Sequence, residues 1–257
     1  YFDGGRWPKA TDGGGSTLEL RDLNADNGDA VAWAASDESN RTEWKTYTYR
    51  ERAASSRGPD NQWREFNMGL LSDGEILIDD ISVIENPGGG AVQKLSDTTF
   101  NNPAAWKLVG NHRHGEIIDD PDTPGNKVLR IVATGATEHM HNQIFTKLSS
   151  AISNGTEYEI SFRARWVSGS RQLHTRLYFN RCANVNLIDR PQDVGTPSAP
   201  NSRAEGNIGP TYSGMKHSPA VPSAGEPTTV SVVANDPDGI SSLTLFYSVN
   251  GGAFQTV

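Results

Sequence analysis

Apolar and polar residues alternate along most of this chain, in short runs separated by clusters of Gly, Pro, Asn and Asp. Alternation places every second side chain on one face of a β-strand, whereas a helix needs apolar residues three and four positions apart. No window keeps the helical spacing, and recurring short runs are typical of a sandwich or barrel. The expected strands are 17–21, 43–49, 64–71, 75–85, 127–134, 157–167, 172–180, 228–234 and 243–249.

Breaks in this pattern predict the domain organisation. A Pro-Gly-Gly-Gly turn follows Asn86, and a polar stretch rich in Pro and Gly runs from Arg190 to Ser223. The segment 17–21 resembles 128–132, which favours a tandem repeat of one module. The predicted fold is all-β, with tandem jelly-roll sandwiches and the first strands of an immunoglobulin-like sandwich. The expected units are a first module at 1–87 that is incomplete at its N-terminus, a linker at 88–94, a second module at 95–190, an extended linker at 191–223 and a partial immunoglobulin-like domain at 224–257.

Two adjacent aspartates interrupt the alternation within 75–85. The apolar residues change parity between Ile78 and Ile81, so the change falls on Asp79 and Asp80. A change of parity inside one strand predicts a β-bulge. Carboxylates at a bend are oxygen ligands of the kind that Ca²⁺ takes, so this pair is either a structural calcium site or a solvated acidic bulge.

The second module carries the candidate binding surface. The alternation within 157–167 leaves Arg163 and Arg165 on one face and an apolar set on the other, consisting of Tyr158, Ile160, Phe162 and Trp166. The run 172–180 is expected to bury three residues and to expose four. The inward set is Leu173, Leu177 and Phe179, and the outward set is His174, Arg176, Tyr178 and Asn180.

Three interpretations of this polar face stay open. It is a merely polar outer face, a sugar platform in which rings stack on pyranose faces, or a transition-metal site. Arginine forks match carboxylate and sulfate groups, so an anionic polysaccharide suits the platform best. The platform also includes Trp106, His139 and His141, and the metal hypothesis places Zn or Cu on His112 and His114, because neutral imidazoles are common ligands of these metals.

Composition narrows the function classes. The chain of 257 residues has a formal net charge of −8, which argues against a general nucleic-acid binder that must neutralise phosphates. No apolar run is long enough to cross a bilayer. Cys182 is the single cysteine, so no intrachain disulfide forms, and it is expected to be a small apolar core residue. The chain starts at Tyr1 without Met or signal peptide, which indicates the interior of a longer protein.

Several segments carry a resemblance to known families. Residues 7–20 resemble the end of a bacterial lamin-tail domain, and 33–39 and 74–85 are similar to carbohydrate-binding modules of galactose-binding-like fold. Residues 106–114, 124–142 and 158–181 resemble a second such module, and 195–202 with 236–247 resemble a linker and an immunoglobulin-like domain. This order resembles large exported planctomycete-type proteins with lamin-tail and spore-coat-protein-H-like kinase domains. The resemblance implies that a carboxylate of the Asp79–Asp80 strand holds structural calcium.

The expected function is binding rather than catalysis, because no set of nucleophile, base and orienting group is visible. We expect a secreted or cell-surface bacterial region that binds polysaccharide or cell-surface glycan through the second module. The alternative is a structural or adhesive element of an extracellular fibre or surface layer. In that case the partners are copies of the same chain, or other domains of it, that complete its strand edges.

Overall fold

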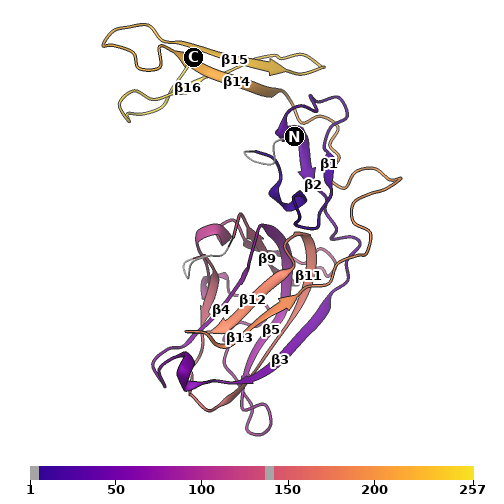
Figure 1. The fold of residues 1–257 in the computed structure, drawn as a ribbon, viewed down its shortest axis with the longest axis vertical. Coiled ribbons are helices and arrows are strands. Elements are labelled where there is room, and N and C mark those ends of the chain that lie inside the picture. Colours follow the sequence, from indigo (N-terminus) through magenta and orange to yellow (C-terminus); the bar gives the residue numbers. More distant parts are fainter. Residues whose placement is uncertain (1–5, 137–141) are drawn as a thin grey trace.

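The computed structural model describes residues 6–136 and 142–257 and confirms the all-β class. Its helical segments are 3₁₀ turns of three residues, and its strands form several antiparallel sheets. Figure 1 shows a large sandwich, a small N-terminal sheet above it and a group of C-terminal strands beyond that sheet.

Two antiparallel sheets form the sandwich. The first has the strand order β3 (Lys45–Arg52), β11 (Glu157–Gly169), β5 (Gly74–Glu85), β9 (Lys127–Ala133) and β8 (Glu116–Asp119), with β6 (Val92–Gln93) also paired to β5. The second has the order β13 (Arg181–Leu187), β12 (Gln172–Leu177), β4 (Glu65–Leu70), β10 (Ile144–Lys147) and β7 (Trp106–Leu108). We call them the six-stranded and the five-stranded sheet.

The inward faces of the two sheets share one core. The apolar set predicted for β11 is buried, including Tyr158, Phe162 and Trp166, each no more than 1% exposed. Phe66 and Leu173 face them from β4 and β12. Buried Cys182 belongs to the same core, as the sequence predicted.

The predicted division into two modules at 88–94 is wrong. Strand β5, from the expected first module, lies between β11 and β9 of the expected second module. Strand β4 lies likewise between β12 and β10. The two halves therefore interleave into a single sandwich, and the likeness between 17–21 and 128–132 is no repeat, since β1 pairs with β2 and β9 with β5 and β8.

The predicted bulge at the two aspartates is confirmed. The pairing of β5 with β11 shifts register between Ser161, which lies opposite Ser82, and Arg163, which lies opposite Asp79. Asp80 adopts a positive φ of 47° at this point. The shift moves the inward parity from Ile78 to Ile81, so both halves of the strand keep apolar side chains in the core.

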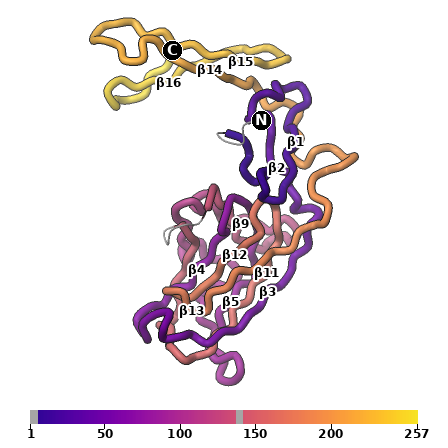
Figure 2. Tube along the Cα trace, viewed as in Figure 1, coloured from indigo at the N-terminus to yellow at the C-terminus, as the bar shows by residue number. Residues whose placement is uncertain are grey.

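The N-terminal sheet consists of β1 (Leu18–Leu20) and β2 (Trp33–Ala35). The segment that follows β13 runs alongside the N-terminal sheet, as Figure 2 shows. Two buried carboxylates of the N-terminal part hold this segment: Glu19 accepts hydrogen bonds from Thr196 and Ser202, and Glu38 accepts one from the amide of Gly195. The expected linker at 191–223 is therefore packed along the N-terminal unit through these contacts.

The last part of the chain forms two small sheets. Strand β14 (Thr211–Ser218) pairs with β15 (Thr229–Asn235), and β16 (Phe246–Tyr247) pairs with β17 (Gln255–Thr256). Because β14 lies inside 191–223, that range is not a linker throughout. Large apolar side chains of this part are exposed, among them Phe246 at 65% and Phe254 at 75%.

Candidate functional site

The polar residues expected on a single face lie on opposite sides of the sandwich. Strands β11 and β12 follow each other in sequence but belong to different sheets. Arg163 and Arg165 therefore face outward from the six-stranded sheet, whereas His174 and Arg176 face outward from the five-stranded sheet. The sequence predicted correctly that these side chains point away from the core. It wrongly placed them on a single sheet face, because alternation does not report to which sheet a strand belongs.

On the six-stranded sheet, both predicted arginines are engaged within the fold. Arg163 Nη1 lies 3.1 Å from Asp80 Oδ2 and 3.7 Å from Asp79 Oδ2, and its guanidinium stacks 5.1 Å from the ring centroid of Trp44. Arg165 is buried and pairs with Asp122. Carboxylates therefore compensate the positive charge of both guanidinium groups.

The aspartate pair does not fit a calcium ion held by both carboxylates. Asp79 is buried, with Oδ1 accepting from the amide of Asp80 and Oδ2 from Asn126 Nδ2, at 2.8 and 3.0 Å. The Asp80 side chain is 52% exposed. Arg163 lies against both, so a guanidinium supplies the positive charge that a cation would bring. No cluster of three or more His, Cys, Asp or Glu ligands occurs within 6–136 and 142–257.

Trp106 and His112 are structural rather than ligand-facing. Trp106 is 3% exposed, and its Nε1 donates to Asp97 Oδ2 at 3.1 Å, so its ring is not available to a sugar. His112 is fully buried, and its Nε2 accepts from the amide of Leu70 at 3.0 Å. Burial lowers the pKa of His112 to about 4, against a smaller opposing effect of the Asn142 backbone. The neutral imidazole thus serves a backbone amide, not a metal.

Among the described residues, the remaining predicted histidines do not complete a metal site. His114 is exposed on the turn before β8. His139 and His141 lie outside the described residues. Burial, and then the charge of Arg176, lowers the pKa of His174, which keeps that imidazole neutral near pH 7.

The outer face of the five-stranded sheet centres on Arg176. Its Nη1 donates to Asn180 Oδ1 at 2.6 Å, and its Nη2 donates to Gln143 Oε1 at 3.0 Å. Asn67 lies beside it in register on β4, is 1% exposed and has no hydrogen-bond partner for its side-chain amide among the described residues. The guanidinium is therefore oriented by neutral amide oxygens, which leave its positive charge uncompensated.

Three aromatic rings lie next to this arginine. Tyr178 and Phe179 stack with centroids 4.5 Å apart, and Trp63 meets them edge-on at 5.1 and 6.2 Å. Trp63 and Phe179 are each 39% exposed. Phe179 was expected in the core, but β12 ends at Leu177, so the alternation stops before it reaches Phe179. We call Trp63, Tyr178 and Phe179 the aromatic cluster.

Arg181 binds the backbone of the aromatic cluster from the core side. This residue is fully buried, and its Nε donates to the carbonyl of Tyr178 at 2.9 Å. Its Nη1 donates to the carbonyl of Pro59 at 2.9 Å and to Asn154 Oδ1 at 3.2 Å. One guanidinium thus ties three loops together at the end of the sheet that carries the rings.

Replacing Arg181 with Met is expected to lower the free energy of unfolding by about 3 kcal/mol or more, because several buried carbonyls lose their donor while the apolar stem is kept. Urea unfolding measures this value. Arg57→Met, an exposed neighbour, is the control and should stay within about 0.5 kcal/mol of the parent chain. A loss at Arg181 as small as that of the control contradicts the structural role.

The two outer faces differ in how their cations are paired. Six cations on or beside the six-stranded sheet form ion pairs with carboxylates: Lys45, Arg50, Lys127, Arg130, Arg163 and Arg165. On the five-stranded sheet, Lys107, Lys147 and Arg176 have no carboxylate within ion-pair distance in the described part of the chain. Lys107 and Lys147 also line a groove of 510 Å³ with Phe145. Three cations without a carboxylate partner therefore lie on the five-stranded sheet, against Arg52 on the described strands of the six-stranded sheet.

Sequence reasoning missed Trp63, Phe145, Gln143 and Lys107 as parts of this face. Trp63 lies two residues before β4 and outside the expected strand 64–71, so alternation gives no information about its orientation. Strands β7 and β10 are three and four residues long, too short for alternation to stand out.

The described part of the chain contains no helix with the length and apolar character that crossing a membrane requires. Comparison with protein-family models, with curated proteins and with solved structures gives no match for the chain. What the protein binds is accordingly inferred from the chemistry of its own side chains.

Proposed function

We propose that this protein is a non-catalytic, secreted or cell-surface binding region that takes up anionic polysaccharide on the outer face of the five-stranded sheet. The observation that carries the proposal is the free positive charge of this face beside exposed aromatic rings. Flat rings offer stacking surfaces for the apolar faces of sugar rings, and aromatic side chains supply much contact area at low conformational cost. A guanidinium without an internal carboxylate has the geometry to hold a carboxylate or sulfate group of the ligand.

A matched pair of arginine variants tests this proposal on the whole chain. Arg176→Met keeps the apolar stem and removes the charge, and we expect about tenfold weaker binding to immobilised anionic polysaccharide, as for a lost charge-assisted hydrogen bond. Arg163→Met makes the same change on the opposite face and should leave affinity unaltered. Affinity electrophoresis measures both. Weaker binding only in Arg163→Met would assign the site to the six-stranded sheet and contradict the proposal.

A structural role in an extracellular fibre is the second candidate. It is favoured by the uncovered apolar side chains of β14–β17, since two-stranded sheets are marginally stable without a covering layer. Strand addition from a neighbouring copy would supply that layer. Sedimentation over a range of protein concentrations tests it: association that Phe246→Ser and Phe254→Ser together abolish supports this role, and a monomer at every concentration rejects it.

A further inference from the structure

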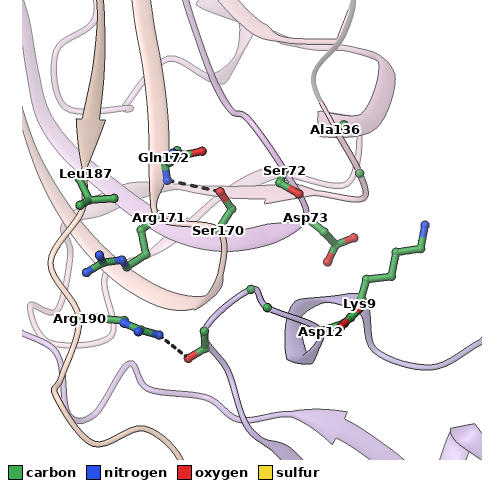
Figure 3. Close-up of a pocket in the computed structure, with 14 residues that line it drawn as sticks. Lys9, Asp12, Ser72, Asp73, Ala136, Ser170, Arg171, Gln172, Leu187 and Arg190 are labelled. Carbon is green, nitrogen blue, oxygen red and sulfur yellow. Dashed lines mark hydrogen bonds between the residues drawn. The ribbon is translucent and has the colours of Figure 1, made fainter. Parts of the chain in front are cut away.

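A cleft of 810 Å³ opens at the end of the sandwich that faces the N-terminal part of the chain (Figure 3). Its lining comes from η1 (Lys9–Thr11) and the glycines that follow it, and from the turns that join β4 to β5 and β11 to β12. The cleft does not overlap the aromatic cluster, which lies at the opposite end of β12.

The cleft has two chemically different walls. Figure 3 shows Arg171 and Arg190 on one side and Asp73 with Lys9 on the other. Arg190 Nη1 donates to the carbonyl of Gly15 at 3.0 Å, and neither arginine lies within ion-pair distance of a carboxylate in the described ranges. Burial raises the pKa of Asp73, and Lys9 opposes this shift. One wall therefore suits an anionic group, and the other suits hydroxyl groups.

The glycine turn adds backbone donors to the arginine wall. Gly13 and Gly15 have positive φ of 73° and 94°, a conformation that glycine adopts without strain. The amides of Gly13 and Gly15 make no hydrogen bond to other described residues. Free amides in a turn form a concavity that accepts anions.

The cleft continues the outer face of the five-stranded sheet. Gln172, which lines the cleft, shares that face of β12 with His174 and Arg176, because alternate residues of a strand point the same way. Arg176 and Gln172 are about 13 Å apart along the strand at roughly 3.3 Å per residue. A polysaccharide lying along β12 from the aromatic cluster would reach the cleft with its next sugar units.

We propose that this cleft is a second subsite, which binds a sugar unit carrying a carboxylate or sulfate through Arg171, Arg190 and the glycine turn, while Asp73 accepts hydrogen bonds from its hydroxyls. The inference rests on the proposed polysaccharide binding and names the acidic unit that the ligand must carry. It makes affinity depend on ligand charge at a place distinct from the aromatic cluster.

Calorimetry on the whole chain tests the subsite with a galacturonic acid oligomer, its methyl ester and a sulfated oligosaccharide. Arg171→Gln should weaken binding of the galacturonic acid oligomer about tenfold and leave the uncharged ester unaffected, and Arg50→Gln on the six-stranded sheet should change neither. An equal loss for the sulfated oligomer supports an anion subsite of either kind, and no loss for it supports a carboxylate subsite.

Unchanged galacturonate binding in Arg171→Gln, with binding still lost in Trp63→Ala, overturns the subsite and leaves the proposed function standing. Absence of binding to all three oligomers by the parent chain overturns both.

Discussion

A fragment containing only residues 95–190 is expected to stay unfolded. Without β4 the five-stranded sheet has no strand between β12 and β10, and without β5 the six-stranded sheet has none between β11 and β9. Both sheets thus lose a central strand, together with core side chains such as Phe66 and Ile78. Losing several fully buried side chains of this size exceeds the whole stability of an ordinary domain, since each contributes about 2–5 kcal/mol.

Far-ultraviolet circular dichroism and amide proton dispersion of the fragment, compared with the whole chain, measure this outcome. The whole chain should show cooperative unfolding, and the fragment should show none. A fragment with protected amides and a cooperative transition would restore the two-module organisation. The result also decides which protein is used in binding assays, because absence of binding by an unfolded fragment carries no information about the ligand.

Trp63→Ala is expected to weaken polysaccharide binding about 30-fold. Exposed aromatic anchors at the centre of a binding surface contribute about 2 kcal/mol when truncated, which corresponds to that factor. Trp63 is 39% exposed and meets both other rings of the cluster edge-on, so its removal also loosens Tyr178 and Phe179.

Trp44→Ala is the matched control for this variant. It removes a ring of equal size from the outer face of the six-stranded sheet, where the indole packs on a small apolar group and under Arg163. Calorimetric affinities of folded Trp44→Ala and parent chain should agree. Equal losses in both variants would show that general destabilisation, rather than a lost stacking surface, explains the effect.

Local features of the fold were predictable from sequence because they depend on neighbouring residues. Alternation in β11 identified the buried Tyr158, Phe162 and Trp166, and the change of parity at Asp79 identified the bulge. Strand pairing was not predictable in this way. The long partners of β5 are β9 and β11, which lie some fifty and eighty residues away in sequence, and no local pattern records which distant strand will lie beside β5.

The candidate site was predicted in part for the same reason. His174, Arg176, Tyr178 and Asn180 lie along one strand and the turn after it, so their proximity follows from sequence alone. The prediction that Arg163 shares this face was wrong because its strand belongs to the other sheet. The prediction of His112 as a metal ligand was wrong because its ring accepts a hydrogen bond from the amide of Leu70 in β4, 42 positions away in sequence.

Hydrogen–deuterium exchange of the whole chain with and without anionic polysaccharide tests the central claim most directly. Binding on the five-stranded sheet predicts slower amide exchange at 63–67 and 172–181, where the aromatic cluster and Arg176 lie. It predicts no change at 45–52 on the outer edge of the six-stranded sheet. Slower exchange confined to β3 and β11, with no change around Tyr178, would contradict the account.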